Sequence, residues 1–225
     1  YEMSASLVGS EMCIRDSYKG LHKNVITDLF GGQYYVDSYN RKSVLAENSV
    51  NGGVTSWVNQ KLGVGDVIRR DYDGFVMYEG GFAQLEYNKD KVSAFVSGGL
   101  TNTSYWRKDR FYYSGDKQLS SKKHYLGGNV KAGLNYNLDD YNNVFFNTGF
   151  ISRAPIFDNT FINSQSSHER NPDAKNEKVY SFELGYGYRS QYFSANVNAY
   201  YTMWKDKALY LSLIHISEPT RLALI

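Results

Sequence analysis

Cysteine is almost absent from this 225-residue chain, which carries a single one at Cys13. A disulfide framework and a cysteine-ligated metal site are therefore excluded, because each needs several thiols. Long hydrophobic runs are also missing, since no stretch approaches the roughly 20 apolar residues that a membrane helix requires. If the chain crosses a membrane, it must do so with strands.

The chain also lacks a large excess of positive or negative charge. The 25 Lys and Arg residues nearly balance the 23 Asp and Glu residues, which leaves a net charge of +2. Two short basic runs, Arg69-Arg70 and Lys122-Lys123-His124, are interpreted as solvated loop charges. Nucleic-acid partners are disfavoured, because binding them requires Lys and Arg clustered on one face.

Aromatic residues, by contrast, are abundant. The chain has 21 Tyr, 12 Phe and 3 Trp, yet its mean hydropathy is only −0.51. A soluble core would rely instead on Leu, Ile and Val. Strands of a membrane barrel alternate a lipid-facing apolar residue with a lumen-facing polar one, so their average hydropathy is low. The composition is therefore compatible with a barrel that crosses a membrane.

The two ends of the chain do not continue the pattern of their neighbours. Residues 211–221 resemble the conceptual translation of a transposase sequencing-library adapter, and residues 7–17 resemble that of its opposite strand. Codons exist that make the DNA of one stretch the reverse complement of the other, and the match extends outward to both termini. We therefore expect 1–17 and 211–225 to be artefacts, including Cys13, and 18–210 to be an incomplete piece of a longer reading frame. The alternative is an amphipathic N-terminal segment and a flexible tail.

Period-two alternation predicts about seven strands and no convincing helix. In the clearest strand, residues 179–189, large apolar side chains occupy every second position, with Ser, Glu, Gly and Arg between them. A tight turn at 190–192 joins it to a partner at 193–204. The other expected strands cover residues 29–36, 81–87, 92–103, 129–138 and 144–151.

The expected connections between strands alternate in length. Short turns fall near residues 88, 140 and 190, whereas long polar segments span roughly 37–73, 105–123 and 152–178. Outer-membrane barrels have short periplasmic turns and long extracellular loops. Several strands also reach the roughly 9 to 11 residues needed to cross a bilayer. These features favour an all-β, transmembrane antiparallel β-barrel fragment over a soluble adhesin-like β-sandwich.

Two motifs resemble the barrels of TonB-dependent receptors. Arg153-Ala154-Pro155 follows a strand, and Asn171-Pro172-Asp173-Ala174-Lys175-Asn176-Glu177 leads into the strand at 180–189. The usual second motif has Pro at the position of Asn176 and often Leu at that of Ala174, so this chain departs from it twice. Residues 29–35 and Gly74-Phe75 are also similar to segments of this family.

The resemblance implies a barrel of about 22 strands with a plugged lumen, of which seven strands are about a third. It also implies a place in the outer membrane of a Gram-negative bacterium and active import of a scarce ligand, such as a siderophore, cobalamin or a glycan. The implied partners are TonB, reached through a missing N-terminal region, outer-membrane lipid and the small-molecule or glycan ligand. An outer-membrane barrel enzyme is the alternative from another class.

No catalytic constellation is apparent, and we predict no enzyme activity, no cofactor and no metal site. His22, His124 and His168 are scattered in or beside expected loops, and Asp139-Asp140 falls in a turn, where Asp is favoured by its local hydrogen bonding. Exposed aromatic and basic residues of the long loops are the candidate ligand contacts, because aromatics can stack on sugars, chelates or corrins. The competing interpretation is that these side chains pack within the loops or form an interfacial belt. The candidates are Trp57, Tyr105, Trp106, Tyr112, His168 and Arg170.

Overall fold

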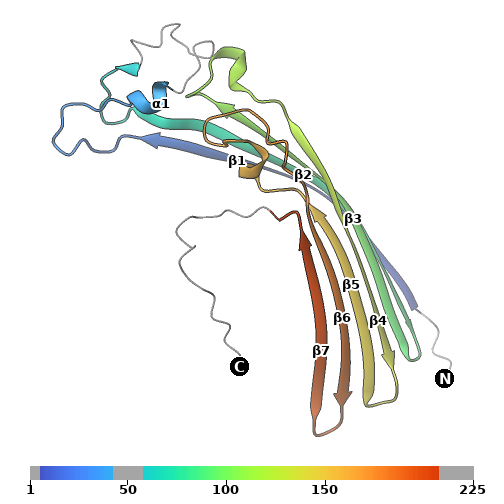
Figure 1. Ribbon diagram of the computed structural model, residues 1–225. Coiled ribbons are helices and arrows are strands. Elements are labelled where there is room, and N and C mark those ends of the chain that lie inside the picture. The colour runs from blue at the N-terminus through green and yellow to red at the C-terminus, as the bar shows by residue number, and fades with distance from the viewer. Residues whose placement is uncertain (1–5, 43–57, 208–225) are drawn as a thin grey trace.

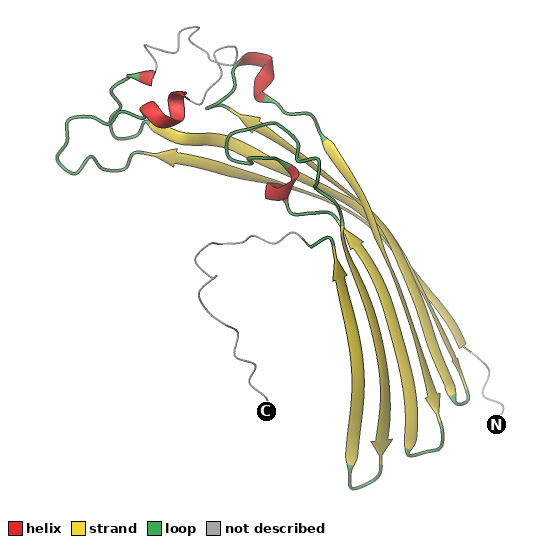
Figure 2. Cartoon of the chain, in the orientation of Figure 1, coloured by secondary structure: helices red, strands yellow, loops and turns green. Residues whose placement is uncertain are grey.

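The computed structural model describes residues 6–42 and 58–207, and they form one antiparallel sheet whose strands follow each other in chain order (Figure 1). Helical structure in the described residues consists only of short turns (Figure 2). None of the described helices is long and apolar enough to span a membrane. The expected all-β fold with about seven strands is confirmed. The strands are β1 (Ser6–Val25), β2 (Val67–Lys89), β3 (Val92–Asp109), β4 (Lys123–Asn137), β5 (Asn142–Arg153), β6 (Glu177–Arg189) and β7 (Ser194–Lys205), and the turns are α1 (Ser38–Lys42), η2 (Gly115–Gln118) and η3 (Phe157–Thr160).

One expected strand, at residues 29–36, is wrong. Phe30 and Gly31 have positive φ angles of 48° and 83°, which interrupt an extended chain. Only an isolated bridge, from Tyr35 to Leu62, remains in that stretch. The seventh strand is instead β1, which pairs with β2 along nearly its whole length and includes residues 6–17.

The connections separate by length, as the sequence predicts. Short turns at 90–91, 138–141 and 190–193 lie at one end of the sheet. The long connections 110–122 and 154–176, and the described parts of the first one, 26–42 and 58–66, lie at the other (Figure 1). In the middle turn, one carboxylate oxygen of Asp139 accepts hydrogen bonds from the backbone N–H groups of Tyr141 and Asn142, both at 2.8 Å. This is the local bonding expected of Asp in a turn.

The two faces of the curved sheet differ in chemistry. The connection 154–176 lies against the concave face, where its Phe157 contacts Gly74. Gly74 therefore faces the concave side, and the strand register shows which residues of the neighbouring strands share that side. The concave face carries polar side chains such as Lys131 and Glu183, whereas the convex face exposes apolar ones. This is the alternation of a barrel wall with lipid outside and a polar lumen inside. Exposed convex residues include Leu100, Leu126, Val130, Leu184 and Val197.

The first half of β1 does not follow this alternation. Its register places Glu11 and Arg15 on the convex face and Met12 and Ile14 on the concave face. A charged residue on the lipid face of a barrel costs up to about 2–4 kcal/mol for Arg at the bilayer midplane, and less for Glu. At these four positions the facing is the opposite of that expected of a barrel strand.

Candidate functional site

The connection 154–176, which we call the β5–β6 loop, folds inward over the long-loop end of β2 and β3. Its Phe157 ring lies over Gly74, where an added Cβ would stand 3.1 Å from the ring. The Tyr105 hydroxyl donates a hydrogen bond to the carbonyl of Pro155 at 2.8 Å, and the Tyr105 ring meets Phe157 edge-on. Tyr105 is consequently buried between the sheet and the loop, with 7% of its surface exposed.

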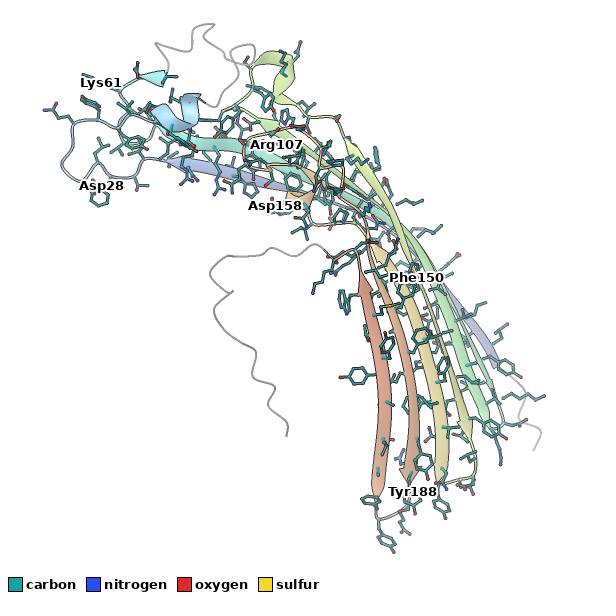
Figure 3. All side chains as sticks on the ribbon, viewed as in Figure 1. Asp28, Lys61, Arg107, Phe150, Asp158 and Tyr188 are labelled. Carbon is teal, nitrogen blue, oxygen red and sulfur yellow. The ribbon has the colours of Figure 1, made fainter. Side chains whose placement is uncertain are left out.

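Arg107 fastens this loop to β3. Its side chain is fully buried, and one guanidinium nitrogen donates to the carbonyl of Ser164 and, at 2.9 Å, to that of Ser167. A second nitrogen pairs with the buried carboxylate of Asp109, and the guanidinium lies 4.4 Å from the ring centre of Tyr72. Figure 3 shows Arg107 and the loop residue Asp158 in the upper, bent part of the sheet. A buried cation requires this many partners, because an unpaired one would be very costly.

Asp109 also shapes the next connection, 110–122. Its second carboxylate oxygen accepts hydrogen bonds from the backbone N–H groups of Phe111 and Tyr112, at 2.8 and 2.7 Å. The two aromatic rings then pack edge to face and are buried. Burial, with the charge of Asp109 second, raises the pKa of Tyr112 to about 12. Tyr112 thus packs within the long-loop end of the sheet, here called the mouth, and does not lie open to a ligand.

Arg170 anchors the returning part of the β5–β6 loop. Its guanidinium lies 4.4 Å from the ring centre of Phe161 and donates to the carbonyls of Ser121 and Tyr105, the latter at 3.5 Å. Burial lowers the pKa of Arg170. One of its nitrogens, Nη1, is buried without a partner among the described residues. The backbone bonds hold Arg170 directly above the end of β3.

His168 joins the β5–β6 loop to the 110–122 connection. Its ring stacks on Tyr113 at 3.8 Å between centres, and its Nε2 lies 3.1 and 3.0 Å from the carbonyls of Lys117 and Gln118. Nε2 must carry the proton to bond carbonyls, which leaves the buried Nδ1 unpartnered. Burial, followed by the positive charge of Arg107, lowers the pKa of His168 to about 4. The ring is therefore neutral near pH 7.

The structure brings together some of the candidate residues and separates others. Tyr105, His168 and Arg170 all belong to the inward-folded assembly, and Tyr112 packs at its edge. Trp106 points to the convex face, away from Tyr105, because neighbouring residues of a strand face opposite sides. Trp57 lies outside the described residues.

Sequence reasoning missed the residues that organise this assembly. Arg107, Tyr72 and Phe161 are among its most buried side chains. The alternation of faces along β3 indicates only that Arg107 lies on the same face as Tyr105. A fully buried arginine gives no further sequence signal, because its carbonyl partners lie 56 to 60 residues away along the chain.

Constellations of catalytic or metal-binding groups are not evident in the described residues. They contain no cluster of three or more His, Cys, Asp or Glu residues that could hold a metal ion. Ser104 and His124 meet on the convex face with 2.8 Å between Oγ and Nδ1, a pairing that the sequence did not reveal. Ser104 is fully buried, so its hydroxyl is not accessible as a nucleophile.

Comparison with known proteins agrees with this architecture. Residues 14–218, nearly the whole chain, match the family described as TonB dependent receptor-like, beta-barrel. The chain belongs to this family. Its members are generally outer-membrane transport proteins and not enzymes, and this TonB-dependent receptor barrel has their wall of long antiparallel strands. No curated protein matches the chain.

Proposed function

We propose that the chain is part of a receptor in the outer membrane of a Gram-negative bacterium that imports a scarce ligand with energy supplied through TonB. The β5–β6 loop carries the proposal, because it lies over the concave, lumen-side face at the end where the long loops gather. A ligand arriving from outside meets this loop before it reaches the lumen. TonB is the partner proposed to supply this energy.

The ligand that fits this mouth is rich in acceptor oxygens, as are siderophores, cobalamin and glycans. Three buried donors that have no partner among the described residues lie in the loop and beneath it: Arg107 Nε, Asn159 Nδ2 and Arg170 Nη1. Leaving a buried donor unpaired costs about 1–3 kcal/mol, so acceptors supplied by a ligand would recover that energy when the loop moves. We assign Arg170 and His168 as the first of the candidate residues to contact the ligand, with Tyr105 beneath them.

Growth under nutrient limitation tests this function. A strain that lacks the whole receptor is supplied with ferric siderophores, cobalamin or oligosaccharides as the limiting nutrient and is complemented with the receptor. One nutrient class should restore growth only with the receptor and only when TonB is present. If complementation restores growth equally without TonB, the active-transport proposal is wrong.

Variants of the loop then test the site. Arg170→Ala should lower the affinity for the rescuing nutrient, measured as binding of the labelled compound to whole cells. Lys175→Ala is the matched control, because Lys175 is an exposed cation of the same loop. Equal losses in both variants, or none in Arg170→Ala, would remove Arg170 from the site.

A further inference from the structure

A row of four side chains crosses β1–β4 on the convex face. Lys19, Phe75 and Trp106 are register partners on neighbouring strands, and Lys122 directly precedes β4. The two aromatic rings are parallel, with 5.2 Å between centres and 2° between planes. Lys19 Nζ lies 5.8 Å from the centre of the Phe75 ring, and Lys122 Nζ lies 4.2 Å from that of Trp106. The row is thus an aromatic platform with a cation at each end.

The row stands just beyond the apolar band of the convex face. Trp106 is 15 residues above the turn residue Lys91 (106 − 91), and about 3.3 Å per residue at a tilt of about 45° gives a height of ~35 Å. The apolar band of such barrels is about 25 Å tall. Between band and row lie the polar Ser104 and His124, hydrogen-bonded to each other. The platform therefore lies at the depth of lipid headgroups at the long-loop side.

Positive charge is in excess around the platform. Arg110 binds both nearby carboxylates, Asp71 at 2.6 Å and Asp73 at 2.9 Å, and Lys19 shares Asp73 at 3.2 Å. No carboxylate among the described residues lies within ion-pair distance of Lys108 or Lys122. An anion approaching the Lys122 end of the row therefore displaces no acidic partner, whereas at the other end Lys19 is shared with Asp73.

A single cation–aromatic pair lies at the other side of the sheet. Lys205 of β7 and Tyr180 of β6 both face the convex side, and Lys205 Nζ lies 5.7 Å from the centre of the Tyr180 ring. Below them the convex face again becomes apolar, with Phe182 and Leu184. Cations seated over outward aromatics thus border the apolar band on both sides of the fragment.

We propose that the convex row Lys19–Phe75–Trp106–Lys122 binds the phosphate-bearing headgroup of a lipid in the surrounding leaflet. The cations match the phosphate, the flat aromatic pair covers the remainder of the headgroup, and the apolar band below accommodates the acyl chains. The face is turned away from the lumen, so a ligand in transit does not pass it. The inference rests on the membrane placement of the proposed function.

Lipid retention tests this site. The full-length receptor is purified in neutral detergent, mixed with lipid A that carries two phosphates or with the same lipid after dephosphorylation, and examined by native mass spectrometry. Lys122→Gln and Lys19→Gln should each reduce retention of the phosphorylated lipid about fivefold, since a lysine at a membrane surface contributes about 1 kcal/mol. Lys122→Arg should retain it, and Lys131→Gln, which removes a cation from the concave face, should leave retention unchanged.

The outcomes separate this inference from the transport proposal. Equal retention by wild type, Lys122→Gln and Lys19→Gln, or equal retention of phosphorylated and dephosphorylated lipid, would overturn the site. Preference for phosphatidylglycerol over lipid A in the same assay would support the site and assign the phosphate to a glycerophospholipid. The assay needs neither nutrient nor TonB, so failure of the uptake experiment does not affect its result.

Discussion

Arg107 is the residue whose loss should release the β5–β6 loop. Arg107→Ala removes the donors to the Ser164 and Ser167 carbonyls and leaves the buried Asp109 without its cation. Breaking one side of a buried ion pair costs about 3–5 kcal/mol. We expect faster amide hydrogen exchange over residues 161–168, with the β6–β7 hairpin unchanged. Lys108→Ala is the control, because Lys108 is exposed on the opposite face; unchanged exchange in Arg107→Ala would contradict the fastening role.

Two convex glycines on neighbouring strands should respond differently to the same substitution. A Cβ at Gly128 would lie 2.6 Å from the carbonyl oxygen of Gly99, whereas a Cβ at Gly98 would lie 3.8 Å from its nearest neighbour. Backbone cannot move aside as a side chain can, so Gly128→Ala should cost about 1–3 kcal/mol of folding free energy, and Gly98→Ala should cost little. The two variants are compared by the urea concentration at which half of the receptor runs as the folded form on unheated gels. Equal midpoints for the two variants would refute the assignment.

The β5–β6 loop should loosen in acid because of His168. With its pKa lowered to about 4 from an ordinary 6.5, the closed loop excludes a proton that the open loop accepts. The contribution of His168 to the stability of the closed loop is therefore complete above pH 6.5. It is lost as the pH falls toward about 4, and below that value His168 causes no further loss. Protease cleavage within the loop should rise across this window. His168→Gln, which cannot titrate, should make cleavage independent of pH there; a wild-type profile in that variant would exclude His168 as the cause.

The strands and short turns were more predictable from the sequence than the long-loop end of the sheet. Alternation located β6 and β7 almost to the residue, because one face of a barrel wall is apolar throughout. It failed at residues 29–36, where aromatic residues imitate a strand but positive φ angles at Phe30 and Gly31 turn the chain. The mouth was less predictable still, since Arg107 is recognised only through carbonyl groups of a distant loop.

The proposed artefact origin of residues 1–17 and 211–225 has a direct test in the locus. The convex facing of Glu11 is unusual for a barrel wall, but Arg15 pairs on that face with Glu79 of β2, and the family match, which begins at residue 14 and ends at 218, extends into both segments. Sequencing the same DNA from libraries made without transposase should replace both segments with other codons that continue the barrel. Recovery of the same terminal codons would show that they are genuine.

For the whole molecule, the open sheet determines behaviour outside a membrane. β1 and β7 each pair on one side only, and the convex face exposes many large apolar side chains. Unpaired edges template association with other chains, and lipid cannot satisfy their backbone groups. Expressed alone without detergent, the chain should therefore form aggregates rich in β-structure, eluting in the void volume in size-exclusion chromatography. Detergent micelles are the comparison, because covering the convex face alone should reduce aggregation while leaving edge pairing intact. A soluble monomer that unfolds cooperatively without detergent would be incompatible with a membrane barrel, whereas dimers in micelles would indicate that the two edges have paired.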